Sequence, residues 1–589
     1  MQSAHAQRIL ASERPSAPHA VATFDDAVAT PQRKLLSETQ QDRLDDLVKD
    51  LPGLDPTAAA SITQRAGRIG LSSSTHNNIF YWHFAASKSP ETAPLVIWLN
   101  GGPGCSSMQG LFLGISPFKL VNGTHIEINK HSWHHSANML FIDQPVGTGM
   151  SQTRGNSYRR DEDGVAHDFY EFLVKFLQSH SEYLSVNPDD NKQISREIYI
   201  FGESHAGRWI PEFSEYILKQ NNQALKEVDL TIRLRGVGIG NGWVHPLIQY
   251  DYSDFAHGLG LLTFGQVRSL KANFVDCQNA LVAGNFNAPA CFNNMNSILA
   301  GLKTSSGKRL NYYDVREYRK SIGTYPSGQD NIVAYLNQPS VRKALHANED
   351  EAFKFEICSD PVFNGLQNFD GVSTLDKVQH MLQRGMKVMF YNGQWDMMCN
   401  HYGTEKLLLN LDWNGSATYQ EAKKYTWMAA HRGDPAGFAQ QGGNLTYLVI
   451  ANGGHMVPYD VPDVAADMMR RFVTGDEFTD SAQTIENTKT NMTDLESLQC
   501  YVSDTTTSST AKVLQLGTTW LWVAVLISVM TSLLAVSVTL MYMRNKKAKQ
   551  PAGHSIIVQE SDDEDAPGSA IDESDEESPK AAPEAASPV

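Results

Sequence analysis

The stretch IYIFGESHAG at residues 198–207 is a short apolar run that leads directly into a serine between small residues. This order predicts a strand, a sharp turn and a helix, the arrangement called a nucleophile elbow. On such a turn the hydroxyl of Ser204 is exposed, and the next backbone N–H can receive an oxyanion. The stretch therefore predicts a nucleophile at the end of a buried strand.

A serine attacks a carbonyl efficiently only with a base and an acidic group that orients the base. Two further apolar runs supply them, because residues 387–391 lead to Asp396 and residues 445–451 lead to His455. The order Ser, Asp, His is that of α/β-hydrolases. Alone, each residue is better explained by a turn, a helix cap or a core position. Three in this order, each after an apolar run, predict a catalytic triad.

Six short apolar runs are bounded by Gly, Asn or Pro and predict buried parallel strands at 94–99, 139–142, 198–201, 237–240, 387–391 and 445–451. Apolar residues at helical spacing from Val165 to Leu177 predict an amphipathic helix on the sheet. This alternation predicts an α/β-hydrolase fold with a mostly parallel, doubly wound sheet. Residues from about 243 to 380 are polar and contain cysteines, and we expect them to form a cap insertion.

The elbow departs from Gly-x-Ser-x-Gly, because Ala206 holds the last position and Gly207 follows it. Its form resembles that of the serine carboxypeptidase family, and so does the chain from about Leu51 to Phe472. The other matching motifs are WLNGGPGCSS at 98–107, NMLFIDQPVGTG at 138–149, GIGNGW at 238–243 and GHMVPYDVP at 454–462. Within that family the segments DLPGL at 50–54, AGRI at 66–69 and YWHF at 81–84 resemble the membrane-anchored, pheromone-processing branch.

The resemblance implies a role for each matching position. It implies the triad Ser204, Asp396 and His455, an oxyanion hole from the N–H groups of Gly102 and His205, carboxylate recognition by Asn100 and Glu203, and a specificity pocket with Gln109, Cys399 and Met456. It also implies the disulfides Cys105–Cys358 and Cys277–Cys291, leaving Cys399 free, while Cys500 has no evident partner. No cysteine spacing is typical of zinc, and we expect neither a metal nor a cofactor.

Four positions depart from the family pattern: Gln109 replaces an acidic residue, Gly114 a glutamate, His205 a tyrosine and Gln394 an aspartate. The neutral amide of Gln109 predicts a weaker preference for basic leaving residues. Gly114 removes the neighbouring carboxyl that would raise the pKa of Glu203, so Glu203 is expected to ionise at lower pH, with burial as the opposing effect.

The C-terminal segment 518–543 runs for about 25 residues without a charge, which is long enough to span a bilayer. Trp520, Trp522 and Tyr542 lie near its ends and a basic cluster follows, which predicts a single-pass anchor with a cytoplasmic C-terminus. A buried soluble helix, the alternative, rarely lacks charges for so long.

We expect five parts in chain order: an N-terminal segment 1–45, a catalytic domain 46–475, a Ser/Thr-rich lumenal stalk 476–517, the anchor 518–543 and a disordered tail 544–589. The tail carries 11 Asp or Glu against 5 Lys or Arg, and we expect it to contact cytosolic sorting adaptors, although a solvated tail without function is an equal alternative. The first 30 residues show no secretory signal, which suggests an incomplete or processed N-terminus.

The formal net charge of −16 and the lack of a basic stripe argue against nucleic-acid binding. The sequons at Asn122, Asn414, Asn444 and Asn491 fit a glycosylated lumenal domain. We therefore expect a serine-type carboxypeptidase of the trans-Golgi network membrane that removes C-terminal Lys or Arg from propeptides. The alternatives are an acyltransferase or esterase on the same fold, and a non-catalytic membrane receptor derived from the enzyme.

Overall fold

The computed structural model describes residues 46–478, apart from 73–75, 156, 187–191, 195, 228–229, 322–324, 348–349 and 430–431. Within these residues no helix is both long and apolar enough to cross a bilayer. The predicted N-terminal segment, the anchor, the tail, Asn491, Cys500 and all of the predicted stalk after residue 478 lie outside the described residues.

A ten-stranded sheet forms the centre of the domain, in the order β1-β2-β6-β3-β9-β10-β13-β16-β15-β14. The pairings from β6 through β16 are parallel, and those toward the two edges are antiparallel. Its strands are β1 (Gln64–Gly70), β2 (Asn78–Phe84), β3 (Leu95–Leu99), β6 (Asn138–Asp143), β9 (Ile198–Glu203), β10 (Leu234–Gly240), β13 (Lys387–Gly393), β14 (Tyr425–Trp427), β15 (Gly437–Gly442) and β16 (Leu445–Ile450).

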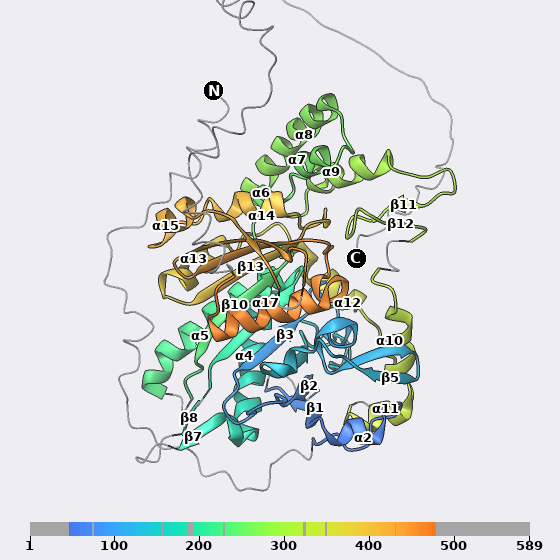
Figure 1. Ribbon diagram of the computed structural model, residues 1–589, viewed down its shortest axis with the longest axis vertical. Coiled ribbons are helices and arrows are strands. Elements are labelled where there is room, and N and C mark those ends of the chain that lie inside the picture. Colours follow the sequence, from blue (N-terminus) through green and yellow to red (C-terminus); the bar gives the residue numbers. More distant parts are fainter. Residues whose placement is uncertain are drawn as a thin grey trace, which may run out of the picture. The chain divides into compact units, whose positions relative to one another are not determined.

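The helices that cover the sheet pack on both of its faces (Figure 1). Alternate residues of the central strands enter two separate apolar cores, as Ile97 and Ile200 do on one face and Trp98 and Phe201 on the other. The core that contains Ile97 and Ile200 includes α4 (Glu162–Ser179), α5 (Ala206–Glu227) and α13 (Leu375–Gln383). The other includes α3 (Met108–Gly110), the π turn Leu111–Ile115, α10 (Gln329–Leu336), α11 (Pro339–Ala344) and α17 (Pro462–Thr474).

Part of the predicted cap insertion has a small core of its own, which lies at one end of the domain in Figure 1. It is built on α6 (Pro246–Gln249), α7 (Ser253–Gly258), α8 (Phe264–Val282) and α9 (Pro289–Ala300). The disulfide Cys277–Cys291 joins α8 to α9. The remaining described elements are short: α2 (Pro56–Ala60), α12 (Asp360–Leu366), α14 (His401–Leu408), α15 (Ser416–Glu421), α16 (Val457–Asp460), β4 (Phe118–Asn122), β5 (His125–Ile128), β7 (Leu184–Val186), β8 (Lys192–Ile194), β11 (Arg309–Leu310) and β12 (Tyr318–Arg319).

All six predicted strands are present, as is the helix over residues 165–177, which is α4. The predicted α/β-hydrolase fold with a mostly parallel sheet is confirmed. The antiparallel edge strands β1, β2, β14 and β15 were not predicted. The boundaries 243 and 380 of the cap stay a prediction.

Candidate active site

The predicted elbow is formed where β9 passes into α5. Ser204 has a φ of 64°, a conformation that an L-residue adopts only at a cost. Its N–H donates to the carbonyl of Gly240 over 3.0 Å, and its carbonyl accepts from the N–H of Trp243 over 3.0 Å. Gly101 packs against the turn so closely that a Cβ there would lie 2.5 Å from the backbone nitrogen of His205. The turn is therefore held by backbone contacts on two sides.

Asp396 and His455 are directly hydrogen-bonded, with Nδ1 of His455 2.8 Å from Oδ2 of Asp396. Asp396 is fully buried and also accepts from the N–H groups of Met398 over 2.9 Å and Cys399 over 3.2 Å. The backbone N–H of His455 donates to the carbonyl of Tyr313 over 2.8 Å. With Nδ1 facing the carboxylate, Nε2 is the ring nitrogen left to exchange a proton.

The three predicted triad residues follow neighbouring parallel strands. Ser204 follows β9, Asp396 follows β13 and His455 follows β16, with β10 between the first two. The carboxyl ends of parallel strands meet at one edge of a sheet, where ligands bind in such folds.

The pKa of His455 lies above its ordinary value. Burial lowers this pKa, but the charge of Asp396 and its hydrogen bond raise it, and the carboxylates of Glu203 and Asp460 act in the same direction. The ring is therefore suited to hold a proton once it has accepted one.

Asn241, directly after β10, lies in the GIGNGW motif, and the sequence alone indicated no role for it. Its Nδ2 donates to Oδ2 of Asp396 over 2.8 Å, and its Oδ1 accepts from the N–H of Gly393 over 3.1 Å. Its own N–H donates to the carbonyl of Tyr391 over 2.7 Å. The position of a polar residue directly after a central strand was the one sequence signal for a role at the site. Its partner Asp396 could not be inferred, because it is 155 residues away in sequence.

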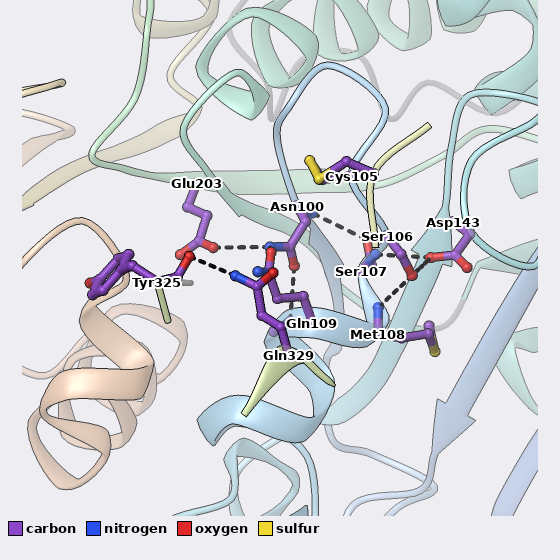
Figure 2. Close-up of a disulfide and its surroundings, with 12 residues drawn as sticks. Asn100, Cys105, Ser106, Ser107, Met108, Gln109, Asp143, Glu203, Tyr325 and Gln329 are labelled. Carbon is purple, nitrogen blue, oxygen red and sulfur yellow. Dashed lines mark hydrogen bonds between the residues drawn. A yellow bond between two sulfur atoms is a disulfide. The ribbon is translucent and has the colours of Figure 1, made fainter. Parts of the chain in front are cut away.

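The positions assigned to carboxylate recognition form one buried chain of hydrogen bonds, which Figure 2 shows next to the Cys105 disulfide. Nδ2 of Asn100 donates to Oε1 of Glu203 over 3.0 Å and lies 3.3 Å from Oε1 of Gln109. Oδ1 of Asn100 accepts from Nε1 of Trp98 over 2.7 Å and from the N–H of Gly110 over 3.1 Å. These two donors fix the orientation of the Asn100 amide, so that its NH₂ group faces Glu203.

Burial raises the pKa of Glu203 to about 7. The charge of His455 and the hydrogen bond from Asn100 lower it, while the Asp460 carboxylate raises it. Burial, the opposing effect, therefore sets the direction of the shift, and the expectation that Glu203 ionises at lower pH than in relatives with a carboxyl at position 114 stays a prediction. The Glu203 side chain is 3% exposed, and desolvation disfavours its charged form.

Gly114 lies against the backbone of α16. It has a φ of 152°, and a Cβ at this position would lie 2.1 Å from the carbonyl oxygen of Pro458. A glutamate cannot be accommodated here without displacing α16. The chain thus has no room for the second carboxyl at this position, and burial, helped by the carboxylates of Asp460 and Asp396, accounts for the direction of the Glu203 shift.

The three predicted pocket residues lie around this chain and the dyad. Gln109 is 8% exposed and faces Asn100 (Figure 2). Cys399 is a free, buried cysteine whose carbonyl accepts from Nδ2 of Asn392 over 2.7 Å, and burial raises the pKa of its thiol. Met456 follows His455 and is 5% exposed.

The loop after β3 carries the other predicted oxyanion donor. Gly102 has a φ of 116°, and a Cβ there would lie 2.7 Å from the backbone nitrogen of Cys105. Within the described part of the chain, the N–H groups of Gly102 and His205 make no hydrogen bond, so both are available to a ligand. Asp143, to which the sequence assigned no role, holds this loop by accepting from Oγ of Ser106 over 2.7 Å and from the N–H of Ser107 over 2.9 Å.

Both disulfides implied by the resemblance are present. Cys105–Cys358 fastens the oxyanion loop to the segment before α12 (Figure 2). Asp396, Cys399 and His455 each place one donor atom within 4.8 Å of the others, but the hydrogen bond between Asp396 and His455 already explains this proximity.

Three of the four sequons lie in the described residues. Asn122 and Asn414 are exposed. Asn444 differs, because its Nδ2, the atom that carries an N-glycan, donates to the carbonyls of Leu382 over 3.0 Å and Met386 over 2.6 Å. Asn122 and Asn414 are therefore the better acceptors, and glycosylation stays a prediction.

Comparison with known proteins agrees with this geometry. The serine carboxypeptidase profile (Peptidase S10) matches residues 52–475. The chain is 59% identical to the pheromone-processing carboxypeptidase KEX1 of Phytophthora infestans over 90% of both chains. It is 34% identical to the serine carboxypeptidase S10 family member 2 of Dictyostelium discoideum over 77% of this chain and 80% of that one.

A solved structure is similar as well, that of Kex1(delta)p, a prohormone-processing carboxypeptidase from Saccharomyces cerevisiae. The TM-score is 0.65 at 27% identity, covering 74% of this chain and 96% of the yeast protein. A profile match over most of the chain, a relative of nearly full length and a matching fold all point to one family. The chain belongs to the serine carboxypeptidase family and is a serine-type carboxypeptidase.

Proposed function

We propose that Ser204, His455 and Asp396 hydrolyse the last peptide bond of a substrate through an acyl-enzyme. His455 Nε2 takes the proton of the Ser204 hydroxyl as Oγ attacks the scissile carbonyl carbon, and then delivers that proton to the leaving amine. Asp396 fixes the ring tautomer and stabilises the imidazolium. The N–H groups of Gly102 and His205 receive the oxyanion. Water, activated by the same histidine, then releases the shortened peptide and restores Ser204.

One observation carries the exopeptidase assignment: the buried Asn100–Glu203 pair lies directly beside the nucleophile. A free α-carboxylate binds there only if the site offers donors rather than negative charge. With a pKa of about 7, Glu203 is protonated in the mildly acidic lumen of the late secretory pathway and can donate to that carboxylate. Asn100 supplies a second donor. An internal peptide bond, which lacks the carboxylate, gains nothing from this pair.

The substrates that we propose are propeptides that end in Lys or Arg after an endoprotease has acted. The names of the Phytophthora and yeast relatives, which describe pheromone and prohormone processing, support this choice. Gln109 supplies a neutral amide rather than a carboxylate near the leaving residue, so the preference for basic over apolar residues is expected to be moderate.

We further propose that residues 518–543 anchor the enzyme in the trans-Golgi network membrane, with the catalytic domain lumenal. The charge-free segment and the basic cluster after it support this orientation. The serines before the acidic runs in 559–577 are suited to phosphorylation and to binding basic adaptor surfaces. Deletion of 559–577 should move the protein out of this compartment in a localisation assay; unchanged residence would refute the sorting role.

The activity is tested with an N-blocked dipeptide that ends in Arg, its C-terminal amide and its methyl ester. Release of free arginine from the dipeptide, with kcat/KM at least tenfold above that for the amide at pH 6, is the expected result. Equal rates on the acid and the amide would contradict carboxylate recognition. Transfer of the acyl group to an added alcohol in preference to water would favour the acyltransferase alternative.

A further inference from the structure

The side chain of His205 lies in a buried cluster of charged groups directly behind the nucleophile. Its backbone N–H is the proposed oxyanion donor, and its imidazole is 3% exposed and packs against Trp209 with 5.0 Å between ring centroids. Its main chain and its side chain thus belong to two different environments. Contacts that hold the imidazole also restrain the backbone of this residue.

A carboxylate lies near each ring nitrogen of His205, as an ion pair rather than an aligned hydrogen bond. Nδ1 lies 2.9 Å from Oδ1 of Asp370, and Nε2 lies 3.8 Å from Oε1 of Glu162, the first residue of α4. Nε of Arg208 is 3.4 Å from the same Oε1, and its guanidinium also donates to the carbonyl of Val372. The cluster therefore joins α4, the first turn of α5 and the segment that returns from the cap insertion to α13.

The charges of this cluster balance only if His205 is an imidazolium. The two cations His205 and Arg208 then face the two anions Glu162 and Asp370. A neutral imidazole has one N–H and would turn a lone pair toward one of the carboxylates. It would also leave one negative charge in excess where His205, Glu162 and Arg208 are each less than 10% exposed, which is costly.

The neighbouring charges do not alter this balance. The next ionisable groups along α5 and α13 are Glu212, Asp376 and Lys377. Nζ of Lys377 lies 3.3 Å from Oε1 of Glu212 and 3.8 Å from Oδ2 of Asp376, and the Asp376 side chain is exposed and screened by solvent. Burial lowers the pKa of His205, but Asp370 and Glu162 raise it, and the pKa ends above the ordinary histidine value.

We propose that the imidazolium of His205 is a positioning residue that, through Asp370 and Glu162, holds the oxyanion N–H in place and couples it to the return segment of the cap. Loss of its proton releases that segment and misaligns the N–H. The chemical step then slows while substrate affinity is little changed. This inference rests on the proposed role of Ser204 as the nucleophile.

The test measures kcat and KM against pH with the blocked dipeptide ester, because an ester has no free carboxylate and the ionisation of Glu203 does not enter. For the parent enzyme kcat is expected to fall as pH rises through the pKa of His205. In His205→Gln kcat at neutral pH is expected to be about tenfold lower than in the parent, a smaller loss than the ~100-fold caused by removal of an oxyanion donor. The KM of this variant is expected to stay within twofold of the parent value, and its kcat is expected to show no alkaline fall. His380→Gln, at an exposed histidine of α13, is the matched control and keeps the parent profile.

Asp370→Asn is the second variant, and it tests the role of the His205 imidazolium if His205→Gln does not fold. It keeps the shape of the side chain but removes one of the two anions, so the alkaline fall of kcat is expected at lower pH. Parent-like kcat in His205→Gln, or an unmoved alkaline fall in Asp370→Asn, would overturn the proposal. Fluorophosphonate labelling of Ser204 in the parent separates this failure from a failure of the proposed mechanism, since only the latter abolishes labelling.

Discussion

The side-chain amide of Asn241 donates to Oδ2 of Asp396 over 2.8 Å, and that same oxygen lies 2.8 Å from Nδ1 of His455. Asn241 follows β10, the strand between the one that carries Ser204 and the one that carries Asp396. It therefore orients the Asp396 carboxylate from β10, which pairs with the strand that leads to Ser204. Gly240, the residue before Asn241, accepts from the N–H of Ser204 over 3.0 Å, so the end of β10 contacts both the elbow and the dyad.

Replacement of Asn241 by alanine is expected to lower kcat about tenfold with little change in KM. Asp396 keeps its backbone donors but loses the amide that directs Oδ2 toward His455, so the imidazole is held less well in the productive tautomer. Steady-state kinetics on a blocked dipeptide check this. Asn285→Ala, at an exposed asparagine of the cap, is the control. A fall confined to KM would show that Asn241 acts on binding instead.

The ionisation of Glu203 is expected to set the alkaline limit of peptidase activity. Protonated Glu203 donates to the substrate carboxylate, whereas ionised Glu203 repels it, so kcat/KM on the blocked dipeptide falls as pH rises through about 7. At one pH unit above that value about a tenth of the enzyme remains protonated, which gives an approximately tenfold loss.

Glu203→Gln tests this assignment because glutamine is a donor at every pH. On the dipeptide the variant is expected to lack the fall that belongs to Glu203 and to show only the alkaline fall of kcat that the ester also shows. The amidated dipeptide is expected to behave alike with both enzymes. If the alkaline fall persists unchanged in Glu203→Gln, another group controls it.

Gln109→Asp is expected to raise the Arg-to-Leu ratio of kcat/KM about tenfold, since a carboxylate near the leaving residue attracts a cation in a partly desolvated site. Gln109→Asn keeps the amide and controls for the shorter side chain. The measurement compares blocked dipeptides that end in Arg and in Leu. The same ratio in both variants would mean that position 109 does not govern specificity.

The six central strands were predictable because parallel strands covered on both faces are continuous apolar runs, as LVIWL in β3 is. The edge strands were not, since β15 has the sequence GFAQQG and carries no such signal. Its place depends on pairing with β16, which is a tertiary contact.

The residues of the candidate site also fall into those that the sequence predicts and those that only tertiary contacts reveal. Ser204, Asp396 and His455 could be found from sequence because each follows a recognisable strand. The roles of Asn241 and Asp143 could not, since their partners are distant in sequence. For the pKa of Glu203 the sequence named burial as an opposing effect but could not weigh it, because only the structure shows how completely the folded chain excludes water from the carboxyl.

The most direct measurement is made on Ser204→Ala, with Ser87→Ala at an exposed serine as the control. Both variants are expected to keep the parent melting temperature, because Ser204 contributes backbone hydrogen bonds that alanine retains. The account predicts that Ser204→Ala releases arginine from the blocked dipeptide at least ~1,000-fold more slowly than the parent. It also predicts that a fluorophosphonate adduct maps to Ser204 in the parent and Ser87→Ala and is absent from Ser204→Ala. Turnover by Ser204→Ala within a few fold of the parent would contradict the proposed mechanism.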